Sequence, residues 1–186
     1  MSKQFVHLHT HSHYSLLDGL SKIPELVKKA KSYGMPALAL TDHGSMYAAI
    51  EFYKECKKAE IKPIIGVEAY IANRSRFDKD PGVDNKRFHL TLLARNTQGY
   101  KNLMTLVTKA NLQGYYYKPR MDKDLLKEYG DGLICLTGCP GSEFVHYLKS
   151  DDLDSARGLV QFYIDTFGRE YVFVEIMKHD EVEWYV

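Results

Sequence analysis

Short apolar runs alternate with helix-like segments along the chain, and this alternation limits the possible folds more than any other feature. Runs such as ALALT (37–41) and IIGV (64–67) are apolar at successive positions, as expected for strands covered on both faces. Such alternation predicts parallel β/α units with right-handed crossovers, in an open sheet or an incomplete barrel. Strands are predicted at 5–9, 37–41, 63–71, 89–94, 133–137 and 171–177, and helices at 21–33, 45–59, 97–112, 122–129 and 152–167.

Composition narrows the class of protein. A chain of 186 residues, 45% of them hydrophobic, fits one domain that buries roughly 70% of its unfolded surface. A net charge of +1 argues against binding duplex DNA mainly through a basic surface. Apolar runs stay far below the ~20 residues of a membrane span, and the polar N-terminus does not resemble a signal peptide. We therefore expect no membrane association. The three cysteines form no disulfide framework, which favours a reducing, cytoplasmic location.

The N-terminal segment HLHTHSHYS (7–15) has a histidine at every second position from His7 to His13. Residues two apart on a strand point to the same face, about 6.6 Å apart. His9 and His11 can therefore direct two imidazoles at one ion. An exposed strand with alternating histidines explains this motif equally well, so the motif does not decide between a metal site and a surface strand.

Further polar residues stand at or near the ends of predicted strands. Asp42 and His43 follow one strand in TDHG, Glu68 lies in the apolar run IIGVEAY, and Cys139 follows ICLTG, while Asp18 lies in a turn. Each has a simpler explanation: a helix cap, a structural ion pair, packing or a turn. A buried carboxylate is costly, however, unless it is paired or binds a metal. Because barrel active sites lie at the carboxyl ends of strands, we favour a barrel with a metal site.

These residues also carry a family resemblance. HLHTHSHYSLLDG, MPALALTDHGSMYAAIEFYKEC, IKPIIGVEAYIA, FHLTLLARNTQGYKNLMTL and GLICLTGCPGSE resemble the successive motifs of the PHP (polymerase and histidinol phosphatase) domain. They are most similar to the version at the N-terminus of bacterial DNA polymerase III alpha subunits, over nearly the whole chain. The resemblance implies one PHP domain over 1–186, with the α/β fold of a distorted seven-stranded β/α barrel.

The resemblance also implies that the chain is part of a longer protein. The family's last motif, an Asp-x-His, should follow the strand that ends near Met177, but it is not found before Val186. We therefore expect about six of the seven barrel strands here, and two metal ligands fewer than in the complete domain.

In this family the barrel holds a trinuclear metal centre. Imidazole and thiolate ligands favour zinc, whereas carboxylates also admit manganese or iron. Glu68, His9 and His11 are expected to act through bound metal and hydroxide, and two metals about 3.5–4 Å apart can hold both oxygens of an in-line displacement. Asp42 is expected to orient a ligand histidine, and His89 rests on the resemblance alone. The implied ligands are His9, His11, Asp18, His43, Glu68, His89 and Cys139.

The activity implied by the resemblance is a metal-dependent phosphoesterase that acts as a 3′→5′ proofreading exonuclease during DNA replication. Its substrate would be a single-stranded DNA 3′ end, and its partners the rest of the polymerase alpha chain, a proofreading exonuclease subunit and the replicase holoenzyme. Two alternatives stay open: a non-catalytic module that braces the polymerase and docks that subunit, and a free-standing phosphomonoesterase.

Two loop-like segments complete the predictions. In GYYYKPRMD (114–122), Tyr116, Lys118 and Arg120 suit stacking on bases and contacts with phosphates of a single strand. A packed loop with solvated charges is the alternative for this segment. The polar segment 73–88 is expected to be a mobile surface loop.

Overall fold

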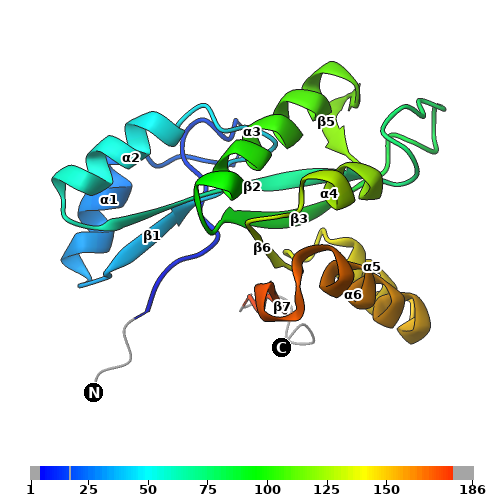
Figure 1. Ribbon diagram of the computed structural model, residues 1–186. Helices are drawn as coiled ribbons and strands as arrows, with labels where there is room; N and C mark the ends of the chain where they lie inside the picture. Colours follow the sequence, from blue (N-terminus) through cyan, green and yellow to red (C-terminus); the bar gives the residue numbers. More distant parts are fainter. Residues whose placement is uncertain (1–4, 17, 178–186) are drawn as a thin grey trace.

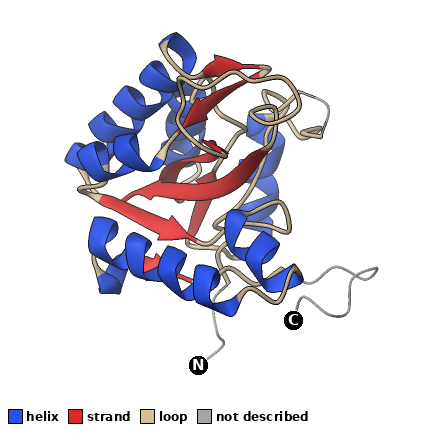
Figure 2. Cartoon of the chain, turned by 90° about the vertical axis from the view of Figure 1, so that its right-hand side faces the viewer, coloured by secondary structure: helices blue, strands red, loops and turns tan. Residues whose placement is uncertain are grey.

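The computed structural model describes residues 5–16 and 18–177 (Figure 1). Helices lie around the outside of the strands (Figure 2). The helices are α1 (Ile23–Ser32), α2 (Ala49–Lys58), α3 (Thr97–Leu112), α4 (Lys123–Tyr129), α5 (Glu143–Lys149), α6 (Leu153–Phe167) and the 3₁₀ turn η1 (Arg169–Tyr171). The strands are β1 (Ala37–Leu40), β2 (Lys62–Ala72), β3 (Arg87–Ala94), β4 (Tyr115–Tyr116), β5 (Lys118–Met121), β6 (Leu133–Leu136) and β7 (Val172–Phe173).

Strand β2 is the centre of a mixed sheet with the order β4-β5-β2-β3-β6-β7. Along one edge, the first part of β2 pairs in parallel with β1, and Tyr70 and Ile71 pair in parallel with β5. Along the other edge β2 pairs with β3 in antiparallel orientation. Strand β6 is antiparallel to β3 and parallel to β7. The mixed α/β class is confirmed.

The prediction of parallel pairing throughout is wrong for β2–β3 and β3–β6. The connection between β2 and β3 contains no helix, and a parallel return would need a long crossover, usually a helix. The chain therefore returns beside β2 in the opposite direction. Within the described residues the sheet is open, because β4 and β7 stand at its two ends without pairing to each other.

Several predicted boundaries are also corrected. Residues 5–9 form no strand, although the carbonyl groups of His7 and Thr10 accept hydrogen bonds from amides at positions 39 and 41 beside β1. The predicted strand 171–177 is limited to Val172–Phe173. Helix α5 and the short strands β4 and β5 were not predicted, because these short segments show neither a continuous apolar run nor a long helical pattern.

The two faces of the central strands have different roles. Val67 and Ala69 of β2 and Leu90 and Leu92 of β3 are buried in the main apolar core, together with residues of α3, α4 and α6. Successive strand residues point to opposite faces. The intervening residues of β2 and β3 therefore lie on the face away from these helices, and they include Glu68, Tyr70, His89 and Thr91.

A second apolar cluster joins α1, β1 and α2. Val27 of α1, Leu38 of β1 and Phe52 of α2 are buried in it. None of the helices in the described part of the chain is long and apolar enough to cross a membrane.

Segment 73–86 forms no helix or strand, as expected for a surface loop, and charged side chains hold it against the rest of the chain. Arg74 donates two hydrogen bonds to the fully buried carboxylate of Asp84, and Arg76 donates to Asp122 at 2.9 Å. Arg120 of β5 is fully buried, and its guanidinium donates to the backbone carbonyl groups of Arg76, Asp78, Asp84 and Gly114. We call Arg74, Arg76, Arg120, Asp84 and Asp122 the arginine cluster.

Candidate metal centre

Glu68 lies at the middle of the central strand, on the face away from the main core. Pairing with β1 ends at Ile65 and pairing with β5 begins at Tyr70, and between them a parallel bridge joins Glu68 to His43. The Glu68 side chain is only 2% exposed. The side chains around this carboxylate, with Glu68 itself, form what we call the histidine cluster: His9, His11, Asp18, His43, Glu68, His89 and Cys139.

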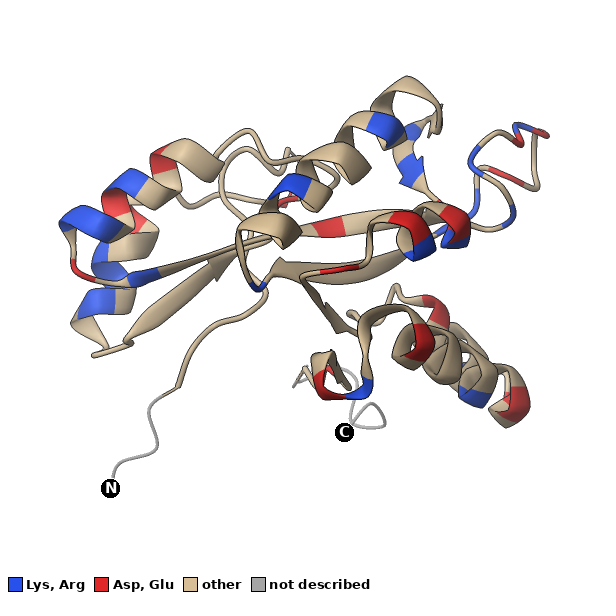
Figure 3. Cartoon of the chain, in the orientation of Figure 1, with Lys and Arg blue, Asp and Glu red and all other residues tan. Residues whose placement is uncertain are grey.

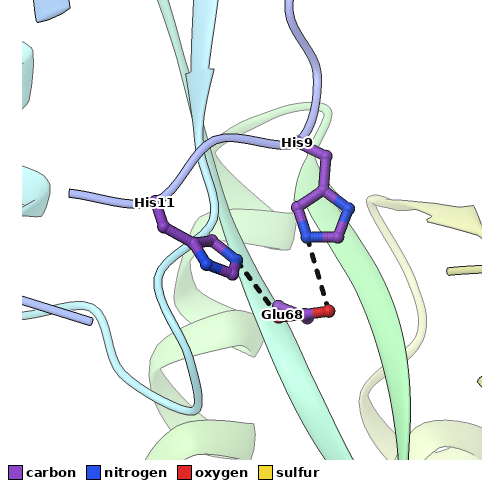
Figure 4. A group of neighbouring side chains, drawn as sticks. All are labelled: His9, His11 and Glu68. Carbon is purple, nitrogen blue, oxygen red and sulfur yellow. Dashed lines mark ion pairs between the residues drawn. The ribbon is translucent and has the colours of Figure 1, made fainter. Parts of the chain in front are cut away.

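His9 and His11 reach Glu68 from the N-terminal segment, as predicted for an HxH pair (Figure 4). His9 Nε2 is 3.4 Å from Glu68 Oε1, and His11 Nε2 is 3.1 Å from Glu68 Oε2. The two imidazoles thus approach different oxygens of one carboxylate. They do so from an extended segment beside β1, and not from the strand that the alternation predicted.

Asp42 holds the turn that follows His11. Its carboxylate accepts hydrogen bonds from the Ser12 amide at 2.7 Å, the Ser12 hydroxyl at 2.8 Å and the Ser15 hydroxyl at 2.7 Å. The Ser15 hydroxyl in turn accepts from the His43 amide at 3.1 Å. Within the described residues, the side-chain hydrogen bonds of Asp42 go to serines, and the Ser15 hydroxyl links Asp42 to the backbone of His43. That Asp42 orients a ligand histidine stays a prediction.

His43 lies between two carboxylates. Its Nδ1 is 2.7 Å from Glu68 Oε2, and its Nε2 contacts Asp18, whose side chain is 51% exposed. His11 Nδ1 is 3.5 Å from the same Asp18 oxygen. Gly44 follows with φ +57, a conformation that glycine adopts readily, so the chain can turn away directly after His43.

His89 and Cys139 complete the cluster from β3 and from the turn after β6. His89 Nδ1 is 2.9 Å from Glu68 Oε1, and the Cys139 thiol donates to the same oxygen at 3.2 Å. Cys139 Sγ is 3.4 Å from His89 Nδ1. Because β3 runs antiparallel to β2, its first residues lie beside the last residues of β2, with Tyr70 opposite His89.

Glu175 is a member of the site that the sequence analysis missed. Its Oε1 is 2.7 Å from His9 Nδ1, and the Thr91 hydroxyl donates to Oε2 at 3.3 Å. The Glu175 amide donates to the Thr137 hydroxyl at 3.0 Å, just after β6. The available signal was a single acidic residue within the apolar run YVFVEI, the same signal that identified Glu68.

The donor atoms of the cluster fit divalent cations. His11 Nε2, His43 Nδ1 and Glu68 Oε2 are buried without a hydrogen-bond partner, although the two nitrogens lie within 3.1 Å of that oxygen. Imidazole nitrogens and carboxylate oxygens are ligands suited to zinc and manganese. Three overlapping groups have ligand atoms within 4.8 Å of one another: His9–His11–Glu68, His11–Asp18–His43 and His43–Glu68–His89.

The same charges set the protonation of the cluster. Burial alone would lower the pKa of His9, but hydrogen bonds to Glu175 and Glu68 raise it to about 9. Burial would raise the pKa of Glu68, but its four histidine neighbours hold it far below its ordinary value. Burial and Glu68 raise the pKa of the Cys139 thiol to about 12. Because ligand atoms must lose protons to bind a metal, metal binding here releases protons.

The three residues predicted to bind substrate, Tyr116, Lys118 and Arg120, have different surroundings in the structure. Arg120 is buried and occupied by backbone carbonyl groups, so the prediction that it contacts phosphate is wrong. Tyr116 lies beside the Arg120 guanidinium, with 5.3 Å from Arg120 Cζ to the ring centroid. Lys118 Nζ is 5.8 Å from the ring centroid of Tyr70, which is stacked on His43.

Two cavities adjoin the cluster. A mostly apolar cavity of about 1040 Å³ lies over β3, β6 and β7 and contacts the cluster only at His9, beside Glu175. A second cavity of about 680 Å³, which we call the metal cleft, is lined by all seven residues of the cluster and extends to α1. The metal cleft is therefore the route by which a substrate can reach the ligand atoms.

Comparison with known proteins agrees with the arrangement of these motifs. Residues 7–179 match the PHP domain family. The DNA polymerase III alpha subunit of Borreliella burgdorferi is 45% identical over 95% of this chain, and that of Thermus aquaticus is 46% identical over 95%. The chain spans 15% of the length of each relative.

Among solved structures, an amidohydrolase from Chromobacterium violaceum overlaps 56% of this chain and 32% of its own, with a TM-score of 0.42 and 23% identity. That overlap is too limited to support an argument about function. The family match covers almost all of the described residues. The chain therefore belongs to the PHP domain family.

Proposed function

We propose that the chain is a metal-dependent phosphoesterase domain that hydrolyses the 3′ end of single-stranded DNA within a bacterial replicative polymerase. The observation that carries this proposal is the convergence of four imidazoles on the buried Glu68 carboxylate, with ligand atoms of Asp18 and the histidines grouped within 4.8 Å of one another. A buried carboxylate is costly unless it is paired or binds a metal, and the imidazoles around Glu68 are themselves metal ligands. Similarity to DNA polymerase III alpha subunits supports the choice of DNA as the substrate.

In this proposal Glu68 would be shared between metal ions, and the other ligands would each bind one ion. Glu68 suits a bridging position, because His9 and His89 approach one of its oxygens and His11 and His43 approach the other. Asp18 is the most exposed carboxylate of the cluster and lies where the site meets solvent. When bound, divalent cations such as zinc or manganese would supply Lewis acidity and hold the attacking and leaving oxygens in line.

Other groups would hold the ligands in place. Asp42 fixes the turn between His11 and Asp18 through Ser12 and Ser15. Glu175 and the Thr91 hydroxyl contact His9 Nδ1, which leaves His9 Nε2 directed at Glu68. Carboxylates that hydrogen-bond the far side of a ligand histidine fix the ring and increase its basicity.

The setting of the domain is part of the proposal, since the chain spans 15% of its polymerase relatives. We propose a cytoplasmic replicase in which the rest of the alpha chain continues from this domain and contributes the remaining strand of a closed barrel with up to three metal ions. A separate proofreading exonuclease subunit is a further proposed partner.

The proposal is tested by elemental analysis of the purified chain and of the double variant His9→Ala/Glu68→Ala. We expect stoichiometric zinc, manganese or iron in the wild-type chain and its loss in the double variant. His146→Ala is the matched control, because His146 contacts Phe88 and Tyr147 and no residue of the cluster. Metal retained in the double variant would contradict the assignment.

Activity is then measured as release of the 3′ nucleotide from single-stranded DNA, with a small phosphomonoester as competitor. Metal-dependent release that is lost in the double variant would support the exonuclease, and preference for the phosphomonoester would support a phosphatase. A folded, metal-free chain without either activity would support the non-catalytic module.

A further inference from the structure

The metal cleft continues beyond the ligand atoms to the surface of α1. Its far wall is formed by Leu26, Lys29 and Tyr33, which lie on one side of the helix because their spacing is three and four residues. In Figure 3 the ribbon of this helix is blue at several positions, which marks lysine or arginine residues. A volume of about 680 Å³ lies within the range of roughly 300–1,000 Å³ typical of ligand sites. The cleft is thus larger than the ligand atoms alone require.

The far end of the metal cleft carries one positive charge and one aromatic ring, from Lys29 and Tyr33. Among the described residues that line the cleft, Lys29 is the only lysine or arginine, and Tyr33 is the only phenylalanine, tyrosine or tryptophan. The Tyr33 side chain is 64% exposed. Lys29 Nζ lies 4.6 Å from the Tyr33 ring centroid, and such exposed cation–π contacts are weak enough to be exchanged for a ligand.

The position of this pair is set by the backbone. Tyr33 caps the C-terminus of α1, where its amide donates to the carbonyl groups of Lys29 and Ala30. Val27 and Ala30 anchor the helix in the apolar cluster with β1 and α2. The pair therefore stands on a rigid element at a fixed place relative to β1 and the histidine cluster.

We propose that Lys29 and Tyr33 form the nucleotide-recognition end of the metal cleft. Tyr33 stacks on a base and Lys29 contacts a neighbouring phosphate, while the scissile phosphodiester lies at the histidine cluster. Base stacking on an aromatic ring beside a cation is how proteins bind single-stranded nucleic acid without sequence preference. This inference rests on the proposed function and assigns its substrate class as a single strand, in place of a small phosphomonoester.

This assignment replaces the sequence prediction for the same role. Tyr116, Lys118 and Arg120 do not line the metal cleft in the described residues. Lys29 and Tyr33 do line it, and both side chains are exposed to solvent.

The test measures binding of a fluorescein-labelled oligothymidylate to the metal-loaded chain by fluorescence anisotropy. Tyr33→Leu is expected to weaken binding about tenfold through the loss of stacking. Lys29→Met is expected to weaken binding and to reduce the slope of log affinity against log salt by about one. Matched controls are Tyr47→Leu and Lys28→Met, since both side chains are exposed and neither lines the cleft.

Circular dichroism and metal content are measured for every variant, so that loss of fold or of metal is detected. Binding by Tyr33→Leu and Lys29→Met equal to that of the wild-type chain would overturn the inference, as would equal losses in the control variants. Hydrolysis by the wild-type chain is measured separately. Binding that depends on Tyr33 without any metal-dependent hydrolysis would overturn the proposed function and support the cleft as a single-strand binding site.

Discussion

The arginine cluster and the histidine cluster both bury charged groups, but they differ in how those groups are satisfied. Arg120 is fully buried, and its guanidinium hydrogen-bonds to backbone carbonyl groups. In the histidine cluster, the imidazoles of His9, His11, His43 and His89 all face the carboxylate of Glu68. Burial of charge is therefore common to both clusters, and only the histidine cluster gathers several potential metal ligands around one group.

The difference separates a structural role from a binding role. A polar network whose donors and acceptors match one another rigidifies a fold, whereas several imidazole and carboxylate ligand atoms around one point can bind a metal ion. The arginine cluster ties segment 73–86 to β5, and the histidine cluster presents nitrogen and oxygen atoms to a common space. Variants of the two clusters should therefore fail in different ways.

The largest effect is expected for Glu68→Gln, which replaces a shared carboxylate by an amide that cannot bridge cations. Metal affinity and hydrolysis should fall at least about 100-fold. Zinc at 100 times its dissociation constant should stabilise the wild-type chain by about 2.7 kcal/mol but not the variant. Elemental analysis and thermal unfolding measure both effects. Glu143→Gln, a buried glutamate paired with Lys123 outside the cluster, is the control, and wild-type metal content in Glu68→Gln would contradict the assignment.

Arg120→Met should show the opposite pattern. The substitution leaves buried carbonyl groups without donors, so we expect the free energy of unfolding to fall by roughly 3 kcal/mol or more while metal content is retained. Urea unfolding of the metal-free chain measures the loss. Unchanged stability, or loss of metal at unchanged stability, would show that the two clusters are not separate.

Asp42→Ala tests whether the turn after His11 supports the site. Removal of the carboxylate leaves the Ser12 amide and two hydroxyl groups unpaired, so His11 and His43 should lose their fixed positions. Supporting residues of this kind typically change metal affinity by about 10- to 100-fold. Competition with a chelator measures the affinity, and Asp124→Ala on the surface of α4 serves as the control. An unaltered affinity in folded Asp42→Ala would remove Asp42 from the site.

The smallest effect is expected for Thr91→Val, which keeps the shape of the side chain. It removes the hydroxyl contacts with Glu175 and His9, each at 3.3 Å. A single hydrogen bond of this length contributes about 1 kcal/mol, so metal affinity should fall about fivefold. The same chelator competition applies, with Thr105→Val on α3 as the control. A loss as large as that of Glu68→Gln would mean that Thr91 supports the fold of the site and not only His9.

Much of the fold and of the histidine cluster could be predicted from the sequence. Helix α3 has its predicted bounds, and β1, β2, β3 and β6 lie within two residues of prediction, because a long helix shows clear periodicity and buried strands stand out as apolar runs. The strand-end rule placed His43 and Cys139 in one region because β1 and β6 each end there, whereas Glu68 was selected as a carboxylate within an apolar run and lies inside β2. The spacing of two residues between His9 and His11 predicted that both imidazoles point to the same side of the chain.

The remaining errors concern strand direction and strand ends. His89 begins its strand, so the rule for parallel strands could not select it, and only the antiparallel β3 brings it beside Tyr70. Glu175 was assigned to the interior of a strand that in fact ends at Phe173, so its position past a strand end was not recognised. Arg120 looked available for phosphate because a local motif does not reveal that distant carbonyl groups enclose it.

The central position of Glu68 also bears on how the site can move. Its amide donates to the Asp42 carbonyl at 3.2 Å, its carbonyl accepts from Gly44 at 2.9 Å, and Thr91 is its partner on β3. Backbone held on both edges opens only with much of the sheet, so its amide proton should exchange slowly with solvent. The segment that carries His9 and His11 lies along one side of β1, where the carbonyl groups of His7 and Thr10 accept from the amides of Ala39 and Thr41. Metal entry and release would then be timed by opening of this segment, while the carboxylate on β2 stays in place.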